Sequence, residues 1–260
     1  GGGGGCVVFL VRSGPPVEEC TLQGVLWILG YPYVGSDVHA SSAAMDKIVA
    51  KHVFGERNLP LARQVVVYKK DGVAAAVDTI ERDLGHQVVV KPARQGSALG
   101  VSIIENANQL HEAVESAFAL DERLLIEERI IGREITVGVL DTDEGCKAFP
   151  VIEITTPEDS WYDYQHRYTQ GLSEHIMPAA LPEAQTRRLQ EIAIAAHESL
   201  GCRDLSRADF VVAGDDEEYL LEVNTLPGMT PTSLYPDGAA GYGLSFAELV
   251  SYLVQRAARR

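Results

Sequence analysis

Short apolar runs, separated by stretches with helical spacing, make up the first part of this chain. The run CVVFLV from Cys6 predicts a strand, and YPYVG predicts a strand that enters a turn. Between them, TLQGVLWILG predicts a short helix that ends at Gly30. Residues 41–54 begin with Ser41, a residue type that caps helices. Apolar side chains follow it at helical spacing, so the segment predicts a helix, with Met45, Ile48, Val49 and Val53 on its apolar face.

The remainder of the chain predicts a mixture of strands and helices. Residues 60–140 predict strands around one helix at 106–118, and residues 182–200 predict an amphipathic helix that starts at a proline. Residues 245–258 predict the closing helix. Residues 143–180 show little periodicity and many aromatic and polar side chains. A compact domain usually keeps a long irregular segment of this kind for function.

The runs RADFVV and YLLEVN carry polar side chains inside apolar strands. Alternation along a strand places Arg207 and Asp209 on one face of the first run, and Glu222 and Asn224 on one face of the second. The turn AGDDEE between them predicts a hairpin. Such a hairpin lines up three hard oxygen ligands, which suit Mg²⁺. A hairpin with a solvated polar face is the alternative.

A lysine at the end of an apolar run gives a second candidate site. The run QVVV leads into Lys91 and then into the loop ARQGSALG. An ammonium group and several backbone N–H groups near one point attract phosphate. The pattern is not a Walker A loop, because there the lysine follows the glycines and here it precedes them. An ordinary surface turn is the alternative.

Residues 124–140 give a third candidate, in which two apolar runs flank a charged stretch and the Gly132 turn. A strand, a short connector and a second strand would form a hinge between two subdomains. Such a hinge offers an adenine ring an apolar slot with backbone donors and acceptors, and Glu134 could accept the ribose hydroxyls. A plain β-hairpin with charged turn residues is the alternative.

Composition narrows the class of protein without naming it. A chain of 260 residues can bury one large core or two smaller ones. With 22 basic and 37 acidic residues, its net charge of −15 argues against nonspecific nucleic-acid binding. Its four cysteines show no metal-binding spacing, and no apolar run approaches the roughly 20 residues that cross a bilayer. We therefore expect a cytoplasmic protein with reduced thiols and no membrane partner.

The order of these segments resembles the ATP-grasp superfamily, and within it the D-alanine–D-alanine ligase family. The resemblance covers about residues 6–256. It rests on TLQG at 21–24, YPYVGS at 31–36, SAAMDK at 42–47, VKPARQGSALGVS at 90–102, IEERIIGREITVGVL at 126–140, WYDYQHRY at 161–168 and EVNTLPGMTPTSLYP at 222–236.

The resemblance implies an α/β (α+β) protein with the ATP-grasp fold, in which two α+β subdomains clasp ATP beside a remnant of an N-terminal α/β domain. The expected division is a glycine leader at 1–5, the remnant at 6–42, a central subdomain at 43–130, and a C-terminal subdomain with the metal site and lid loop at 131–260.

The implied reaction joins two D-alanines through an acyl phosphate, giving D-alanyl-D-alanine for peptidoglycan synthesis. The implied cofactors are ATP and a pair of Mg²⁺ or Mn²⁺ ions, and a homodimer is expected when the N-terminal domain is present. D-lactate or D-serine as the second substrate is one alternative. A catalytically impaired ATP-binding module is another.

The resemblance also assigns roles to individual residues. The phosphates of ATP would pair with Lys47 and Lys91, and the metal ions with Asp209, Glu222 and Asn224. The adenine hinge corresponds to Glu127, Glu128 and Ile130, and the ribose contact to Glu134. The oxyanion would be stabilised by Arg207 and the N–H of Gly228. The carboxylate of the second substrate would bind Ser233 and the N–H of Leu234. The lid loop WYDYQHRY contributes Arg167 and Tyr168, and Ser97 holds it closed.

The chain departs from the family pattern near its beginning and in the lid. Family members carry an early Glu that binds the first D-alanine, and no counterpart is found before residue 6. Ser13 stands where a histidine is expected, Val17 where a flexible glycine is expected, and Arg167 where many members have lysine. We expect residues 6–36 to expose apolar surface as a result.

Overall fold

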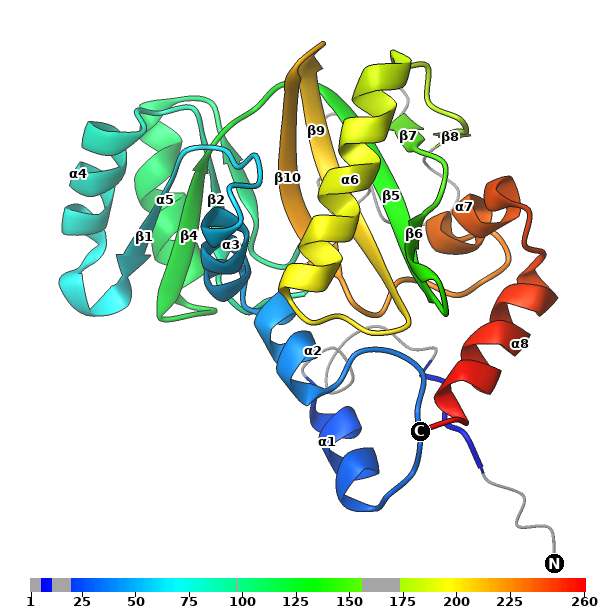
Figure 1. Cartoon of the computed structure of the whole chain (residues 1–260). Coiled ribbons are helices and arrows are strands. Elements are labelled where there is room, and N and C mark those ends of the chain that lie inside the picture. Colours follow the sequence, from blue (N-terminus) through cyan, green and yellow to red (C-terminus); the bar gives the residue numbers. More distant parts are fainter. Residues whose placement is uncertain (1–5, 11–19, 97, 156–173) are drawn as a thin grey trace, which may run out of the picture.

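The computed structural model describes residues 6–10, 20–96, 98–155 and 174–260, and it contains two antiparallel sheets with helices packed on them (Figure 1). The smaller sheet has four strands in the order β1-β4-β2-β3. They are β1 (Gln64–Tyr68), β4 (Arg123–Glu128), β2 (Val88–Pro92) and β3 (Ser102–Ile104). The helices α4 (Val73–Asp83) and α5 (Ala107–Phe118) bury one face of it, through an apolar cluster that includes Ile80, Val90, Leu110, Val114 and Ile126.

The larger sheet has six strands in the order β10-β9-β5-β7-β8, with β6 paired to β5. They are β5 (Arg133–Thr142), β6 (Gly145–Ala148), β7 (Ile152–Thr155), β8 (Glu174–Ile176), β9 (Leu205–Gly214) and β10 (Glu217–Asn224). Helix α6 (Glu183–Ser199) lies across one face (Figure 1). Leu189 and Ala193 of α6 pack there with Val137, Ala208 and Phe210 of the sheet. Side chains that alternate with these three therefore lie on the opposite face.

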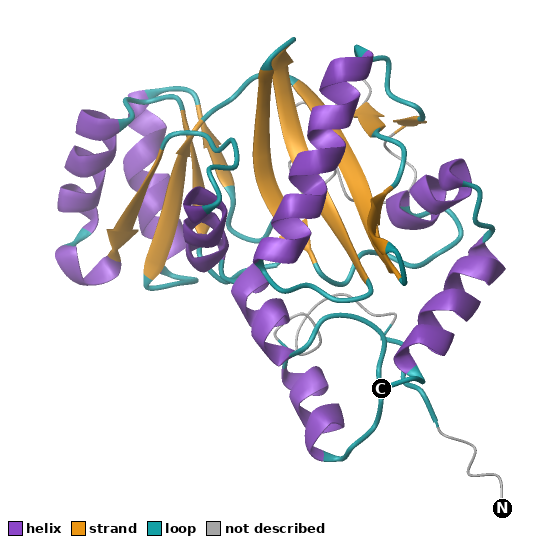
Figure 2. Ribbon diagram, viewed as in Figure 1, coloured by secondary structure: helices purple, strands orange, loops and turns teal. Residues whose placement is uncertain are grey.

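The remaining helices connect or flank the sheets, as the ribbon coloured by secondary structure shows (Figure 2). They are α1 (Thr21–Ile28), α2 (Val38–Met45), α3 (Lys47–Glu56), the short 3₁₀ helix η1 (Lys69–Asp71), α7 (Leu234–Tyr242) and α8 (Phe246–Ala257). Helix α3 lies between the two sheets, next to β4 and β10 (Figure 1). Within the described ranges, no helix is both long enough and apolar enough to cross a membrane.

Several expectations from the sequence are confirmed. The helices at 21–30, 106–118, 182–200 and 245–258 correspond to α1, α5, α6 and α8, and the hairpin is formed by β9 and β10. Helix α8 begins where Ser245 and Glu248 form a capping box, which satisfies two backbone N–H groups at its start. The apolar surface expected on residues 6–36 is also present, with Trp27, Ile28 and Leu29 exposed on and beside α1.

The single helix expected over residues 41–54 is wrong. Two helices, α2 and α3, meet at Asp46, whose ψ of 100° is incompatible with a continuous helix. The Asp46 carboxylate accepts hydrogen bonds from the N–H groups of Ile48 and Val49, so it caps a new helix. The residue that caps α2 is Asp37, not Ser41.

Three other expectations need correction. Residues 60–140 contain a second helix, α4, whose buried Ala76 and Ile80 are one turn apart. The runs CVVFLV and YPYVG share a single parallel bridge, between Val8 and Tyr33, within the described part of the chain, so neither forms a full strand there. Residues 143–180 are not wholly irregular, because β6, β7 and β8 lie within them.

The connector between β4 and β5 joins the two sheets. Strand β4 ends at Glu128 in the smaller sheet and β5 begins at Arg133 in the larger one, so the two strands do not form the alternative hairpin. A Cβ atom at Gly132 would lie 2.3 Å from the carbonyl oxygen of Val212. Glycine at this position therefore lets the connector pass against β9.

Candidate active site

The β9–β10 hairpin brings its polar side chains to one face of the larger sheet. Glu222 pairs directly with Asp209, and Asn224 pairs with Arg207. Directly paired residues of antiparallel strands point to the same face, which here is the face away from α6. A β-bulge lies between Leu220 and Glu222 and redirects the chain just before the Glu222 carboxylate. The register thus juxtaposes the side chains that the sequence analysis named as metal ligands.

The Asp209 carboxylate is held from two sides. Arg207 donates from Nε over 2.8 Å to Oδ1 and from Nη2 over 2.7 Å to Oδ2. Thr136, which pairs with Asp209 from β5, donates from Oγ1 over 2.6 Å. Bidentate pairs of this kind fix orientation as well as charge. Thr136 was not predicted as a site residue, although its two-residue spacing from Glu134 on the same strand indicates the same face.

The donor set of the hairpin suits a divalent cation. Two carboxylates directly opposite each other destabilise a strand pair unless a positive charge offsets them. Asp209 and Glu222 form such a pair, in which Arg207 offsets the charge of Asp209. The Asn224 side chain lies on the same face, with its Oδ1 accepting the Leu226 N–H. Hard oxygen donors of this composition are those that Mg²⁺ takes. The residues present therefore fit the ions that the family resemblance implies.

A second group of charges, which we call the lysine cluster, consists of Lys51, Glu127 and Lys91. The Glu127 carboxylate accepts Lys91 Nζ at 2.5 Å on one oxygen and Lys51 Nζ at 2.7 Å on the other. Although burial of Glu127 opposes its ionisation, the two ammonium groups lower its pKa to about 2. Glu127 is therefore ionised at neutral pH and links α3, β2 and β4.

Lys47 lies close to this cluster at the start of α3. Its Nζ donates over 2.7 Å to the carbonyl oxygen of Gln95, in the loop after β2. Burial lowers the pKa of Lys47, and the nearby Lys91 charge lowers it further, whereas Glu222 raises it. The charges of the lysine cluster and of the Glu222 carboxylate therefore both influence the pKa of Lys47. The structure brings these charges from the two sheets to one place.

The residues expected at the adenine hinge divide into two groups. The Glu127 side chain points to Lys51 and Lys91, a role that the sequence analysis did not foresee. Glu128 ends β4, with its N–H donating to the carbonyl of Arg63, and Ile130 lies in the connector between the sheets. Glu134 lies on β5, on the face that also carries Thr136.

The start of α7 forms the other end of the candidate site. Ser233 is the residue before the helix, and its hydroxyl lies 2.7 Å from Thr230 Oγ1. Leu234 begins the helix, so its N–H belongs to the first turn, where backbone donors have no partner within the helix and anions bind. A Cβ atom at Gly228 would lie 3.0 Å from Ser233 Oγ, so glycine leaves room for the hydroxyl. Ser13, Val17, Ser97, Arg167 and Tyr168 lie outside the described residues.

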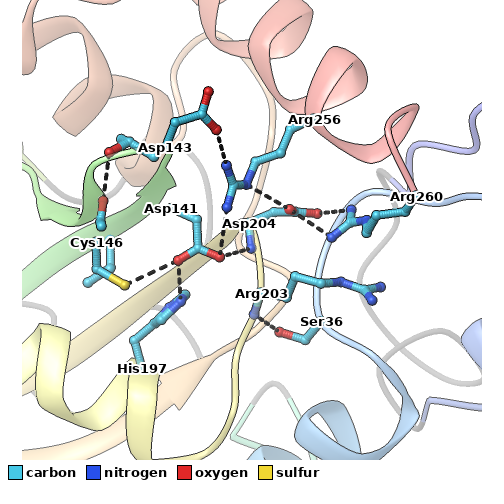
Figure 3. Close-up of polar contacts among 12 residues, drawn as sticks. Ser36, Asp141, Asp143, Cys146, His197, Arg203, Asp204, Arg256 and Arg260 are labelled. Atoms are coloured by element: carbon cyan, nitrogen blue, oxygen red, sulfur yellow. Dashed lines mark hydrogen bonds and ion pairs between the residues drawn. The ribbon is translucent and has the colours of Figure 1, made fainter.

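A third group of polar side chains lies beside α8 (Figure 3). We call Asp141, Asp204, Arg256 and Arg260 the arginine cluster. Asp204 accepts Arg260 Nη2 at 2.6 Å and Arg256 Nε at 3.4 Å, and its N–H donates to Asp141. Arg260 also donates to the carbonyl of Tyr33. The cluster ties the end of the chain to β5, to the turn before β9 and to residues 33–36.

Asp141 also faces a thiol and an imidazole. Cys146 Sγ lies 3.2 Å and His197 Nε2 3.0 Å from Asp141 Oδ1, so three donor types of metal sites lie together. Burial and the Asp141 charge raise the pKa of Cys146 to about 12, which keeps the thiol protonated. A thiol that stays protonated is a poor metal ligand, because cysteine binds metal ions as the thiolate. We therefore assign these contacts to the structural joint.

Two α+β units, each an antiparallel sheet with helices packed on it, are the architecture of an ATP-grasp protein. The family model described as "D-ala D-ala ligase C-terminus" matches residues 53–255. The chain belongs to the D-alanine–D-alanine ligase family. A D-alanine–D-alanine ligase of Geobacter sulfurreducens is 45% identical over 249 residues, which are 95% of this chain and 76% of the relative. One of Halalkalibacterium halodurans is 41% identical over 249 residues, 95% of this chain and 80% of the relative.

Solved structures give the same family. The VanG D-Ala:D-Ser ligase from Enterococcus faecalis superimposes with a TM-score of 0.85 at 33% identity, over 96% of this chain and 72% of that one. The D-alanine–D-alanine ligase of Bacillus anthracis, solved in complex with ATP, gives a TM-score of 0.81 at 29% identity. That match covers 97% of this chain and 79% of the other.

Proposed function

We propose that this protein catalyses the ATP-dependent joining of two D-alanines to D-alanyl-D-alanine. The product would serve peptidoglycan synthesis, and the reaction would take place in the cytoplasm. The observation that supports this most directly is the position of Lys47 at the start of α3, where it lies near the charges of Lys91 in the smaller sheet and of Glu222 in the larger one. The relatives named as D-alanine–D-alanine ligases and the neighbour solved with ATP support the choice of substrates. The four free cysteines suit a reducing compartment.

Phosphoryl transfer requires positioning and charge more than covalent chemistry. ATP gives its γ-phosphoryl group to the carboxylate of the first D-alanine, and the amine of the second attacks the resulting carbonyl as phosphate leaves. Lys47 and Lys91 are placed to pair with the phosphates as compact charges. We assign the adenine slot to the connector after Glu128, with Ile130, and the ribose contact to Glu134.

Asp209, Glu222 and Asn224 are the residues that would hold Mg²⁺ or Mn²⁺, in one or two ions. A divalent cation there supplies Lewis-acid stabilisation of the charge on the phosphate oxygens. The bidentate contact from Arg207 and the hydroxyl of Thr136 fix the Asp209 carboxylate before any ligand arrives. Such pre-orientation lowers the reorganisation needed during the reaction.

The second substrate is assigned to the start of α7. Ser233 Oγ and the N–H of Leu234 would bind its carboxylate, and Gly228 allows its backbone N–H to approach the reacting carbonyl beside Arg207. D-serine is the second candidate for this position, because the structural match at 33% identity is a D-Ala:D-Ser ligase. We further propose that the chain forms a homodimer when an N-terminal domain, which would bind the first D-alanine, is present.

One coupled assay tests the reaction. Phosphate release is measured with ATP and Mg²⁺, supplied with D-alanine alone or with D-alanine plus D-serine or D-lactate, and the products are identified by mass spectrometry. We expect D-alanyl-D-alanine as the main product. Thermal stabilisation by ATP without phosphate release in any mixture would refute the ligase activity and favour a nucleotide-binding module.

A further inference from the structure

We infer that Lys51 is a positioning residue that couples the phosphate-binding lysine Lys91 to the metal-binding carboxylate Glu222. The inference rests on the proposed function of the two sites that it connects. Neither the sequence motifs nor the comparisons assign a role to Lys51. Its place on α3, between the smaller and the larger sheet, allows one ammonium group to contact both (Figure 1).

The Lys51 side chain is buried, with 3% of its surface exposed. Its Nζ contacts Glu127 Oε1 at 2.7 Å and donates over 2.8 Å to the carbonyl oxygen of Leu220. Glu127 belongs to β4 of the smaller sheet, whereas Leu220 belongs to β10 of the larger one. Both of these contacts of the Lys51 ammonium group lie within the protein, so we expect it to act on bound ligands through these two partners.

The first contact controls Lys91. Glu127 accepts Lys51 on one carboxylate oxygen and Lys91, at 2.5 Å, on the other. The position of the Lys91 ammonium therefore depends on a carboxylate that Lys51 holds in place. Lys51 also offsets the charge of Glu127, so that Lys91 is not fully neutralised and keeps attraction for a phosphate.

The second contact controls the hairpin. The Leu220 carbonyl is bound by Lys51, and the Leu220 N–H donates over 2.8 Å to the carbonyl of Pro60. Both backbone groups of Leu220 are thus held from outside the hairpin. The β-bulge begins at this residue and Glu222 follows two positions later. Since a bulge sets the direction of the next side chains, the anchored Leu220 sets the direction of the Glu222 carboxylate.

These two contacts distinguish a coupling residue from an ordinary buried lysine. A lysine that only stabilised the fold would change thermal stability and leave ligand affinities unchanged. A lysine that only oriented Glu127 would change ATP affinity and leave the Mg²⁺ requirement unchanged. Lys51 contacts both sheets, so its loss is expected to weaken ATP and Mg²⁺ together.

The test compares Lys51→Met and Lys51→Arg with the wild-type chain, and uses Lys70→Met as the matched control. Lys70 is exposed on η1, beside the ring of Tyr68. Calorimetry measures ATP binding at saturating Mg²⁺, and a Mg²⁺ titration at saturating ATP measures the metal requirement. Steady-state assays of phosphate release give KM for ATP and for D-alanine, and thermal melts report the folded fraction.

We expect Lys51→Met to weaken both ATP and Mg²⁺ by about 10- to 100-fold, as loss of a residue that orients metal ligands does. Lys51→Arg keeps the positive charge and is expected to recover most of both affinities. KM for D-alanine should stay close to the wild-type value, and Lys70→Met should behave as wild type. Should Lys51→Met fail to fold, the double variant Lys51→Met, Glu127→Gln, which leaves no unpaired buried carboxylate, carries the same measurements with Glu127→Gln alone as its reference.

Three results would overturn the inference: ATP and Mg²⁺ affinities of the folded variant equal to wild type, a loss of ATP affinity with an unchanged Mg²⁺ requirement, or a wild-type chain that does not bind Mg·ATP. Failure of the proposed function looks different, because the wild-type chain would then bind Mg·ATP without releasing phosphate. In that case the binding measurements still decide the role of Lys51.

Discussion

The lysine cluster and the arginine cluster are both groups of opposite charges, but the first is buried throughout, whereas Arg256 and Arg260 of the second are partly exposed, and their balance of charge differs. In the lysine cluster two ammonium groups share the single carboxylate of Glu127, and Lys47 lies nearby. In the arginine cluster two guanidinium groups face the two carboxylates Asp141 and Asp204 (Figure 3). In a balanced set the charges neutralise one another, whereas a surplus of positive charge between the two sheets attracts an anion.

The two clusters also differ in their hydrogen-bond donors, which are guanidinium groups in one and ammonium groups in the other. Guanidinium groups make fixed, planar contacts, and Arg260 uses two nitrogens to bind both oxygens of Asp204. Ammonium groups are compact charges on flexible stems and suit a ligand that comes and goes. The arginine cluster therefore joins segments of the fold, and we propose that the lysine cluster prepares a phosphate site. Substitutions at the two clusters and at the ends of the site should separate these roles.

The largest effect is expected from Glu222→Ala in the hairpin. Loss of the carboxylate removes a metal ligand, and charge stabilisation by a bound cation is worth several kcal/mol, so phosphate release should fall by about 1000-fold. Circular dichroism should show a folded chain. Glu217→Ala, which removes an exposed carboxylate from the same strand, is the matched control and should remain active. Unchanged phosphate release in Glu222→Ala would refute the ligand assignment.

The arginine cluster should respond in stability and not in catalysis. Asp204→Asn removes the fully buried carboxylate that faces the partly exposed Arg256 and Arg260, and loss of these charge-assisted hydrogen bonds should cost about 2 kcal/mol of unfolding free energy. Urea unfolding measures the loss, and KM for ATP should change little. Asp143→Asn, at an exposed partner of Arg256, should cost less than about 1 kcal/mol. A larger change in KM than in stability would contradict the structural role.

A smaller and more selective effect is expected at the start of α7. Ser233→Ala removes one hydrogen bond to the substrate carboxylate, so KM for D-alanine should rise by about tenfold. KM for ATP should stay unchanged, because the nucleotide is assigned to the other end of the site. Thr232→Ala, at the exposed neighbouring residue, controls for a local change of backbone. Equal changes in both KM values would contradict the placement of Ser233.

The smallest expected effect is a loss of stability in acid at Glu127 of the lysine cluster. The pKa of Glu127 is lowered from 4.5 to about 2, so the folded state binds its proton at lower pH than the unfolded state does. The stability that this carboxylate contributes is present above its unfolded pKa and is lost as pH falls from about 4.5 towards about 2. Unfolding free energies of wild type and Glu127→Gln, measured across this range, should converge as pH falls. A constant difference would show that Glu127 is not ionised in the fold.

Local pattern was sufficient to predict the hairpin, because side chains alternate along a strand with a period of two residues. The pairing of Asp209 with Glu222 then follows from the turn between the strands. Local pattern was not sufficient to predict the break between α2 and α3 at Asp46, where a helix cap interrupts a run that otherwise has helical spacing. Helix α4 was missed although its apolar residues recur at helical spacing, at Val73, Ala76, Val77 and Ile80.

The lysine cluster could not be predicted from local pattern at all. Lys51 and Leu220 are 169 positions apart, and their contact exists only because α3 packs between the two sheets. The same holds for Glu127, which the sequence motif placed at the adenine hinge and whose side chain the fold directs to two lysines. Family resemblance supplied the names of the site residues, and tertiary packing decides how they are connected.

A double-mutant cycle of Lys91→Met and Glu222→Gln, measured as Mg·ATP affinity by calorimetry, tests most directly whether the two sheets form one site. The residues belong to different sheets, and Lys51 keeps Glu127 paired when Lys91 is replaced. If both contact the same bound Mg·ATP, their effects should be non-additive, with a coupling energy between about 0.5 and 3 kcal/mol. Additivity within about 0.3 kcal/mol would show that they act independently and would contradict a shared nucleotide and metal site.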